Sequence, residues 1–504
     1  MSTGRLLARN SALNFFGQVV PILVAIVAIP PLVRGLGPER FGVLTLAWAA
    51  IGYFSLFELG LSRALTQAVA HRLGAGARED LPEVTWTALA LLFLLGCAGS
   101  LVVAALTPPL VNRVLNIPLE LRQETMRSFW ILAASLPLVV FTVGLRGLME
   151  AHQHFGVATL LRVPLAALMF VGPLLVLPFS RSLVPAVSIL ALARAAGFLA
   201  HLAFCLRAYP YLRQRVAIAR GQVRPLLRFG GWMTVSNIVS PMMVFLDRFL
   251  VGALLPLAAV AHYVTPYEAS VRMLLLPMAL LGAMLPAFAA TVHNNAARMA
   301  QLYDRSLRGV LLVMFPVVLV GVALAREGLS LWVGPVLPET SAVVMQWLLL
   351  GVFINGMAQA PLTALHSAAR PDLVAKLHVV ELPFYAVGIY LLVHAFGLAG
   401  VAVAWTARVA IDAAALLWIA RRTLGLRVLP DARVRWALIL MLALIGGAAL
   451  PGSTQPRVIF VVTSLLLFAP IGWFVLLQPT EREGLMDWLR RPTRTTLPPS
   501  EELA

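Results

Sequence analysis

The chain has 504 residues, of which 60% are hydrophobic and only 12% charged, and its formal net charge is +17. Soluble proteins carry about 25% charged residues, so this composition excludes an ordinary soluble enzyme of two or more domains. The positive balance does not indicate nucleic acid binding either, because most arginines lie in short gaps between long apolar stretches.

About fourteen apolar stretches fill the chain from residue 11 to residue 477. A helix that crosses a bilayer needs roughly 20 mostly apolar residues and satisfies its backbone hydrogen bonds internally. The stretches run over 12–33, 41–69, 84–106, 128–149, 157–179, 183–206, 229–253, 260–291, 309–325, 341–366, 374–396, 398–419, 434–450 and 458–477. We therefore predict an all-α polytopic membrane protein with no gap large enough for another domain.

The basic residues predict the orientation of these helices. If the N-terminus is cytoplasmic, the gaps on that side and the two tails hold roughly three times as many Lys and Arg as the opposite gaps. The first stretch follows Arg5 and Arg9 like a signal peptide, but it is long and carries Pro21 and Pro30, which favours a retained helix. Both ends of the chain are thus expected in the cytoplasm.

Residues for common enzyme chemistry are missing from the sequence. Lys376 is the single lysine and lies in Ala-Lys-Leu, so the chain holds no phosphate-binding Gly-Lys-Ser/Thr loop. Cys97 and Cys205 fall in apolar stretches and do not indicate a disulfide framework. His152 and His154 lie in a gap without a neighbouring carboxylate cluster, which favours solvated side chains over metal ligands. We expect no catalytic residue, metal or cofactor, and therefore a transporter.

Two stretches resemble each other at an offset of 210 residues. Gly42, Tyr53, Phe57 and Glu58 correspond to Gly252, Tyr263, Tyr267 and Glu268. Six intervening spans would give both halves the same orientation, related by an axis along the membrane normal. The repeat predicts an N-terminal six-helix lobe (1–206), a basic cytoplasmic linker (207–228), a C-terminal six-helix lobe (229–420), two extra transmembrane helices (421–478) and a cytoplasmic tail (479–504).

Several charged residues fall inside the apolar stretches. Each costs about 2.5–3.5 kcal/mol at the centre of a spanning helix, so it should face a cavity or a partner. Glu268 with Arg272, and Arg408 with Asp412, are spaced to pair on one helix face, so mutual neutralisation is one explanation. Arginine outnumbers acid among these residues, which favours a cavity for an anion, because guanidinium binds phosphate through two parallel hydrogen bonds.

Several segments resemble the polysaccharide biosynthesis flippases of bacterial O-antigen and exopolysaccharide clusters. The most specific are FGGWMTVSN at 229–237, FLDRFLVG at 245–252, YVTPY at 263–267 and GLAGVAVAWTAR at 397–408. The segments at 34–42, 52–61, 369–372 and 381–383 are similar to the same family, whereas nothing beyond residue 426 resembles it. The family belongs to the multidrug/oligosaccharidyl-lipid/polysaccharide exporter superfamily.

The resemblance implies both fold and cargo. It implies two six-helix bundles arranged as a V. The two C-terminal helices lie outside the resemblance, and we expect them to hold the lipid tail beside a charged cleft between the lobes. It implies a multi-pass protein of the bacterial inner membrane that moves undecaprenyl-pyrophosphate-linked oligosaccharide from the inner to the outer leaflet. Alternating access coupled to a gradient of H⁺ or Na⁺ is expected, as are contacts with membrane lipids and with the polymerase and glycosyltransferases of the pathway.

Nine charged residues are predicted to form the site. We expect Arg63, Arg272 and Arg408 to bind the diphosphate. We expect Glu58, Glu268 and Glu381 to couple transport to an ion, because burial disfavours the charged form of a carboxylate. Glu381 is the most telling of these, since no arginine lies within four residues of it along the chain. Asp247, Arg248 and Asp412 are expected to be structural charge partners.

Three other functions compete with this prediction. A drug or cation antiporter of the same superfamily should show surplus acid in its cavity, whereas arginine is in surplus here. A membrane-embedded glycan polymerase or ligase generally needs a substantial outer loop, and the outer gaps are short. An inert scaffold for a biosynthetic complex does not explain the charges within the spans.

Overall fold

The computed structural model describes residues 3–75, 79–292, 295–368, 370–427, 431–450, 452–479, 481–483 and 486. All regular structure among these residues is helical, as predicted. Side chains at 227–241 are outside the described part, including those of the 229–237 segment, and most of the predicted tail at 479–504 also lies outside it.

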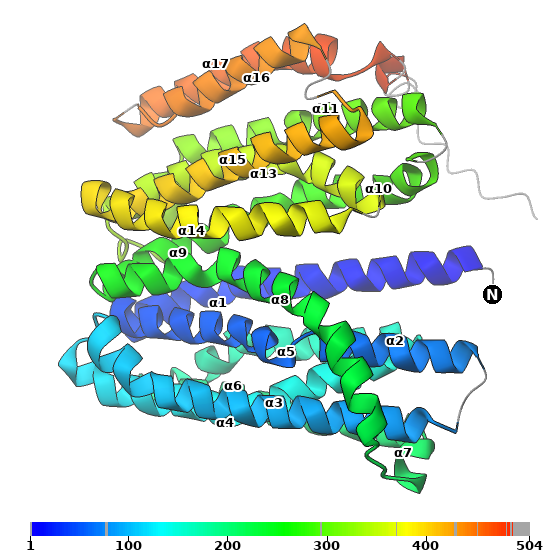
Figure 1. Ribbon diagram of the computed structural model, residues 1–504. Helices are drawn as coiled ribbons and strands as arrows, with labels where there is room; N and C mark the ends of the chain where they lie inside the picture. Colours follow the sequence, from blue (N-terminus) through cyan, green and yellow to red (C-terminus); the bar gives the residue numbers. More distant parts are fainter. Residues whose placement is uncertain are drawn as a thin grey trace, which may run out of the picture. The chain divides into compact units, whose positions relative to one another are not determined.

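The first half of the chain forms helices up to α9 (Figure 1). They are α1 (Thr3–Tyr53), η1 (Phe54–Glu58), α2 (Leu61–Gly74), α3 (Leu81–Pro109), η2 (Leu110–Val114), α4 (Leu119–Ala151), α5 (Phe155–Val176), α6 (Leu183–Ala208), α7 (Tyr211–Gln214), α8 (Arg220–Leu254) and α9 (Ala258–Val271).

The second half begins with a short 3-10 turn and continues in long helices. They are η3 (Arg272–Leu274), α10 (Leu275–Thr291), α11 (Ala296–Ala323), α12 (Ala325–Val333), α13 (Glu339–Ser367), α14 (Pro371–Phe396), α15 (Leu398–Leu424), α16 (Ala432–Gly447), α17 (Thr454–Ile471) and η4 (Gly472–Leu476). Every predicted apolar stretch is largely helical.

Ten helical segments among the described residues are long and apolar enough to cross a membrane. One of them, Val20–Glu58, has 39 residues and would extend about 58 Å as one straight helix, twice the thickness of the hydrocarbon core. Gly37 interrupts it with φ 79° and ψ 162°, a conformation open essentially to glycine alone. The helix is therefore broken in the gap between the predicted stretches 12–33 and 41–69, while the total of fourteen spans stays a prediction.

The second and eighth predicted stretches are both broken in the middle. In the second, η1 ends at Glu58, and Leu59 and Gly60 take left-handed backbone conformations before α2 begins. In the eighth, the 3-10 turn η3 begins at Arg272 and separates α9 from α10. Each of the two stretches thus has a break beside a charged residue, and discontinuous helices form the binding site in many transporters.

The described residues form two compact units. The first comprises 1–272, 325–348 and 372–408, and the second comprises 273–324, 349–371 and 409–504. Within the first unit, α3 packs on α4, α4 on α6, and α1 on α5 and α9. Small residues allow the closest approaches: a Cβ on Gly96 would lie 2.7 Å from the Pro137 backbone. The lobe boundaries predicted from the sequence stay predictions.

In the second unit, Arg308 connects three helices. Its guanidinium on α11 donates to Asp431 Oδ2 (2.8 Å) and to the Val475 carbonyl of η4. Asp431 also caps α16 by accepting from the Val434 N–H. Burial alone would raise the pKa of Asp431, but these hydrogen bonds and the charge of Arg308 hold it below the ordinary value. α16 and α17 are thereby fixed against α11.

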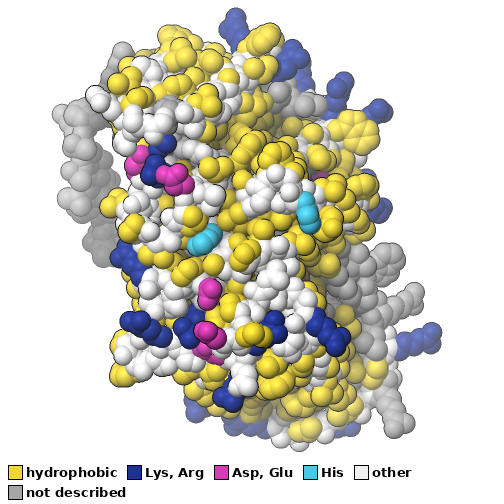
Figure 2. Space-filling view, turned by 90° about the vertical axis from the view of Figure 1, so that its left-hand side faces the viewer, with side chains coloured by type: hydrophobic (Ala, Val, Ile, Leu, Met, Phe, Trp, Pro, Cys, Tyr) yellow, Lys and Arg dark blue, Asp and Glu magenta, His cyan; other side chains and the backbone are white. Residues whose placement is uncertain are grey.

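Large apolar side chains cover the outside of the helices. Leu101, Phe179, Leu192, Phe384 and Trp436 are all well exposed, and on the face drawn in Figure 2 hydrophobic side chains far outnumber acidic ones. Exposed apolar surface on this scale is unusual for a soluble monomer and suits contact with lipid. The observed surface therefore agrees with a polytopic membrane protein.

Candidate functional site

A half-buried acid in the first unit binds two arginines. Glu268 of α9 accepts from Arg248 Nη2 of α8 through Oε1 (2.7 Å) and from Arg272 Nη2 of η3 through Oε2 (2.6 Å). The side chains of Arg248 and Arg272 are only 4% and 17% exposed. The i,i+4 pair predicted between Glu268 and Arg272 is present, but Arg248 joins it from another helix.

Asp247 is bound differently from its neighbour Arg248. Its Oδ2 accepts from the Tyr263 hydroxyl (2.6 Å), and its Oδ1 accepts from the Arg248 backbone N–H (2.8 Å). The guanidinium of Arg248 instead lies between the rings of Phe245 and Tyr267, each centroid 5.2 Å from its central carbon. Aromatic faces stabilise a cation that has left water, which explains how this arginine is accommodated.

A second charge pair lies on α14 and α15. Arg408 Nη1 is 3.9 Å from Glu381 Oε2, and the Arg408 guanidinium lies 5.1 Å over the ring of Tyr385. Tyr267 contacts Trp405 edge to face at 6.0 Å, which connects this pair with the Glu268 cluster. Glu381, which has no arginine nearby along the sequence, therefore has one in space.

Buried polar atoms at these pairs suggest that the site has further binding capacity. Arg248 Nε, Arg408 Nε and the Tyr385 hydroxyl make no hydrogen bond among the described residues. Buried donors without partners are rare in native proteins, and each needs an explanation such as a ligand or water. Two of the three are arginine nitrogens, which donate and never accept, so an anion or another hydrogen-bond acceptor would satisfy them.

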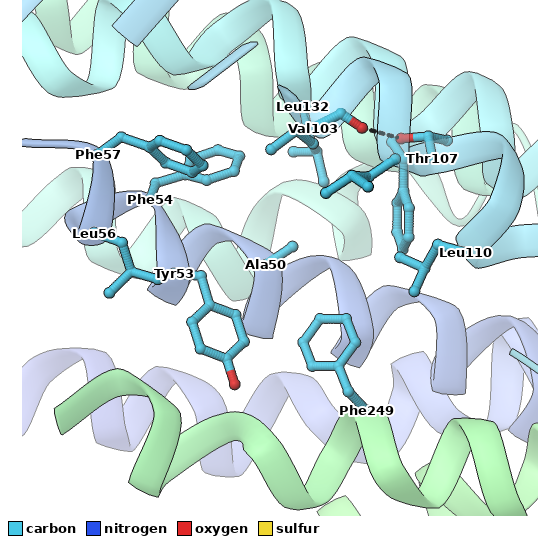
Figure 3. A pocket seen from close by; sticks show the side chains of 12 residues that line it. Ala50, Tyr53, Phe54, Leu56, Phe57, Val103, Thr107, Leu110, Leu132 and Phe249 are labelled. Atoms are coloured by element: carbon cyan, nitrogen blue, oxygen red, sulfur yellow. Dashed lines mark hydrogen bonds between the residues drawn. The ribbon is translucent and has the colours of Figure 1, made fainter. Parts of the chain in front are cut away.

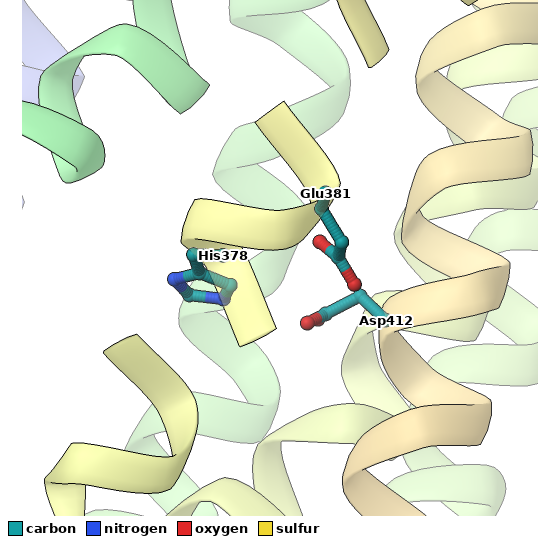
Figure 4. A group of neighbouring side chains, drawn as sticks. All are labelled: His378, Glu381 and Asp412. Carbon is teal, nitrogen blue, oxygen red and sulfur yellow. The ribbon is translucent and has the colours of Figure 1, made fainter. Parts of the chain in front are cut away.

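The remaining predicted residues are more dispersed. Glu58 is buried at the end of η1 and accepts from the Ser62 hydroxyl, whereas Arg63 lies on the exposed face of α2. In Figure 4, His378 lies one turn before Glu381 on α14. Asp412 of α15 is buried. The structure thus places Arg272 and Arg408, but not Arg63, among buried acids and aromatic rings.

The aromatic residues of the site were not singled out as functional from the sequence. Tyr263 and Tyr267 did appear in the internal repeat, as partners of Tyr53 and Phe57, so the repeat was the available signal. Trp405 lies in the 397–408 segment that resembles the family, but nothing in the sequence marked it as part of the site. Tyr385 had no signal, because its neighbours in space are distant along the chain.

The two histidines of the α4–α5 turn differ: His154 is exposed, as predicted from the sequence, whereas His152 is half-buried. The ring of His152 stacks on Tyr209 with centroids 4.0 Å apart, and His154 Nδ1 lies 2.8 Å from the Tyr209 hydroxyl. Burial lowers the pKa of His152 below its ordinary value, and the nearby His154 lowers it further against the opposing effect of the Leu148 carbonyl. This cluster therefore favours an uncharged His152.

Sequence comparison identifies the family. The model of the family described as polysaccharide biosynthesis protein matches residues 7–292. The chain is also 30% identical over 420 residues to the "Putative O-antigen transporter" of Shigella flexneri, an alignment that covers 82% of this chain and 97% of that protein. The chain belongs to the polysaccharide biosynthesis protein family. The family resemblance predicted from the sequence is confirmed.

Solved structures show which fold this family member adopts. The lipid II flippase MurJ in an inward closed conformation matches with a TM-score of 0.70 at 12% identity, covering 94% of this chain and 100% of MurJ. An inward-facing multidrug resistance MATE transporter of the MOP superfamily matches with a TM-score of 0.66 at 18% identity, covering 81% and 97%. These likenesses confirm the polytopic helical fold. The named relatives are transporters and flippases, the class predicted from the sequence.

Proposed function

We propose that this protein moves undecaprenyl-pyrophosphate-linked oligosaccharide from the inner to the outer leaflet of the bacterial inner membrane by alternating access, for O-antigen or exopolysaccharide synthesis. Family membership and the name of the Shigella relative support a polysaccharide precursor as cargo. The MurJ-like fold supports a flippase. The polyprenyl chain can remain in lipid, so the protein has to carry only the diphosphate and the sugars across.

The observation that carries the proposal is the carboxylate of Glu268 shared by Arg248 and Arg272. Two guanidiniums share one carboxylate in a region that is largely closed to water. A diphosphate offers more acceptor oxygens than a carboxylate, and arginine binds phosphate through paired, charge-assisted hydrogen bonds. The substrate head can therefore replace Glu268 as the partner of both arginines.

This exchange would link substrate to an ion. When the diphosphate takes both arginines, the charged form of Glu268 loses its partners in a place with little water and is disfavoured. Proton uptake, or capture of Na⁺, would relieve that cost. By linkage, the ion then strengthens substrate binding as much as substrate strengthens ion binding. Glu58 and Glu381 stay candidate coupling residues beside Glu268.

The charge balance of the cluster supports the same exchange. Arg248, Arg272 and Arg408 face three acids, Asp247, Glu268 and Glu381, so the described cluster has no surplus of arginine when the acids are ionised. A doubly charged anion then binds well only if acids are displaced or neutralised. The anion specificity proposed from the sequence thus depends on this displacement rather than on a simple excess of arginine.

Arginine-to-lysine substitutions test the proposal. In a strain whose own O-antigen flippase is deleted, the wild-type chain should restore surface glycan when its matching pathway is supplied. Lysine keeps the charge but cannot form the fork, and losing one charged hydrogen bond weakens binding about tenfold or more. Arg248→Lys, Arg272→Lys and Arg408→Lys should therefore transport poorly, unlike the exposed control Arg181→Lys.

The outcome separates the competing functions. Normal surface glycan with all three lysine variants, each shown to be inserted at wild-type levels, would refute diphosphate binding at this cluster. If the wild-type chain leaves surface glycan absent but lowers accumulation of a cationic dye, the drug antiporter explanation is correct instead.

A further inference from the structure

An apolar cavity lies inside the first unit, next to the charged cluster. It has a volume of about 190 Å³ and is lined by side chains from α1, η1, α3, η2, α4 and α8, among them Ala50, Tyr53, Phe57, Val103 and Phe249 (Figure 3). The hydroxyl of Thr107, also in the lining, donates to the Val103 carbonyl (2.8 Å) and so presents no free donor. The wall is almost entirely hydrocarbon.

The cavity is closed on one side and reaches the surface on the other. Phe54 and Leu132 form an inner wall that is completely buried, whereas Leu106 of α3 is 58% exposed. The neighbouring surface of α3 carries Leu101 and Val102, both exposed. An apolar chain in the surrounding lipid can therefore enter at Leu106 without crossing a polar surface.

A short series of aromatic rings connects the cavity to Arg248. Tyr53, in the cavity wall, contacts the rings of Phe245 (5.8 Å) and Phe249 (5.5 Å). Phe245 in turn lies under the guanidinium of Arg248, at 5.2 Å. Phe249 lines the cavity and directly follows Arg248 in α8. A molecule with an anionic head at Arg248 and an apolar chain would thus find a place for both within one small region.

We infer that this cavity binds the isoprene units nearest the diphosphate of the polyprenyl carrier. The inference rests on the proposed function, since it adds a chain-binding site to the proposed head-binding site. Apolar protein cavities of about 150 Å³ stay dry and bind benzene. A cavity of about 190 Å³ therefore accommodates a five-carbon isoprene unit, which has nearly the size of benzene.

The chemistry of the head favours an isoprenoid over a phospholipid. In a polyprenyl diphosphate the phosphate is bonded directly to the first isoprene unit, so head and chain occupy adjacent sites. In a phospholipid a glycerol backbone with two polar esters separates the phosphate from its chains. Of the three rings near Arg248 and the cavity, Phe245 and Phe249 offer no hydrogen-bond partner, and Tyr53 offers one hydroxyl for two esters.

This site differs from the one expected from the sequence, which placed the lipid tail beside the two C-terminal spans. The inferred cavity lies on helices before residue 255. It therefore predicts that the first isoprene units, at least, are bound by the N-terminal half of the chain.

Adjacent valines on α3 provide a matched test. Val103 lines the cavity, whereas Val102 is 48% exposed and faces away from it. In the purified full-length protein, dissociation constants would be measured for farnesyl diphosphate, inorganic pyrophosphate, farnesol and dodecyl diphosphate. Wild type and Val102→Phe should bind farnesyl diphosphate at least tenfold more tightly than pyrophosphate. Val103→Phe should bind farnesyl diphosphate no more tightly than pyrophosphate, and its affinity for pyrophosphate should equal that of the wild type.

A second variant controls for the case in which Val103→Phe misfolds. Ala50→Leu fills the same cavity from α1 and should reduce the gain by at least threefold. Unchanged pyrophosphate binding shows that the head site of each variant is intact.

Each result decides a separate point. If Val103→Phe and Ala50→Leu bind farnesyl diphosphate as wild type does, or if the chain adds no affinity in wild type, the cavity is not the chain site. If dodecyl diphosphate gains as much affinity over pyrophosphate as farnesyl diphosphate does, the cavity accepts a linear alkyl chain equally well. The assignment to an isoprenoid would then be wrong. If farnesol binds and Val103→Phe abolishes this, while pyrophosphate does not bind at all, the chain site stands and the proposed head site fails.

Discussion

The carboxylate of Glu268 binds two guanidiniums, so replacing Glu268 affects both arginines at once. Removing one partner of a buried ion pair costs about 3–5 kcal/mol, because the other charge is left buried and unpaired. Here two arginines would be left without their common acid. The side chain that a substrate anion must displace is therefore also one on which the folded site depends.

We predict that pyrophosphate stabilises Glu268→Gln more than it stabilises the wild type. The variant should unfold at a lower temperature in detergent, and added pyrophosphate should recover most of the loss, since the anion takes the vacant place between the arginines. Thermal unfolding followed by tryptophan fluorescence measures both effects. Glu339→Gln, at a 76% exposed side chain, is the control and should show neither. A loss in Glu268→Gln that pyrophosphate leaves unchanged would contradict the exchange.

His152 supplies a prediction about pH. Its pKa is lowered in the folded protein by burial against Tyr209, from an ordinary value near 6.5. Below that pH the unfolded segment takes up a proton before the folded one does, so stability falls as pH decreases from 6.5 toward the folded pKa. Amide hydrogen exchange at the α4–α5 turn should therefore become faster, relative to its intrinsic rate, between pH 7.5 and pH 5.5. His152→Phe keeps an aromatic ring at this position and should abolish the pH dependence of exchange. If the pH dependence persists in His152→Phe, another group causes it.

Among the elements, the breaks in the helices are more informative than the helices themselves. η1 and η3 interrupt the two stretches of the internal repeat beside Glu58 and Arg272. Breaks in a membrane helix free backbone groups and are tolerated where protein or a cavity surrounds them. The two breaks lie in corresponding stretches but not at corresponding residues, because at the offset of 210 η3 corresponds to 62–64, inside α2.

The break at Gly37 gives an element-scale prediction. No atom lies within 4 Å of a Cβ added there, so Gly37→Ala should act through backbone strain alone. With φ 79° and ψ 162° the cost should be about 1–3 kcal/mol. Gly388→Ala on α14 also meets open space, but its backbone is helical, so it should be neutral or slightly stabilising. Thermal unfolding of the two variants side by side measures the difference; equal melting temperatures would show that α1 does not need the break.

At the scale of the whole molecule, helix positions could be predicted because bilayer thickness imposes a length on every apolar stretch. The break at 35–38 was also predictable, since Gly and Pro mark it. The 3-10 turns were not, because Phe54–Glu58 and Arg272–Leu274 contain no Gly or Pro.

The site could be predicted only in part, because sequence spacing reveals pairs within one helix. Glu268 with Arg272 was found in this way. Arg248 lies 20 residues from Glu268, and Glu381 lies 27 residues from Arg408, so these pairs depend on how helices pack and had no sequence signal. The charged residues inside the apolar stretches could be found from the sequence, but their partners on other helices could be identified only in the structure.

The last prediction concerns coupling of the entire transport cycle. If substrate and ion exchange at the cluster, the two conformations must bind them with different affinity, because equal affinity would shift nothing. In proteoliposomes containing a lipid-linked glycan, a pH or sodium gradient should therefore speed translocation by the wild type. Each of Glu58→Gln, Glu268→Gln and Glu381→Gln would be compared with Glu339→Gln, whose exposed side chain lies outside the cluster.

The three acids differ in what their replacement should do. Glu381 contacts one arginine at 3.9 Å, so Glu381→Gln should retain translocation but lose its dependence on the gradient. Glu268 binds two arginines, so Glu268→Gln should lose gradient dependence and also translocate more slowly. A wild-type protein that ignores every gradient would rule out ion coupling altogether. Gradient dependence that persists in Glu381→Gln but disappears in Glu58→Gln would move the coupling site to η1, because there the carboxylate accepts from the Ser62 hydroxyl instead of pairing with an arginine of the cluster.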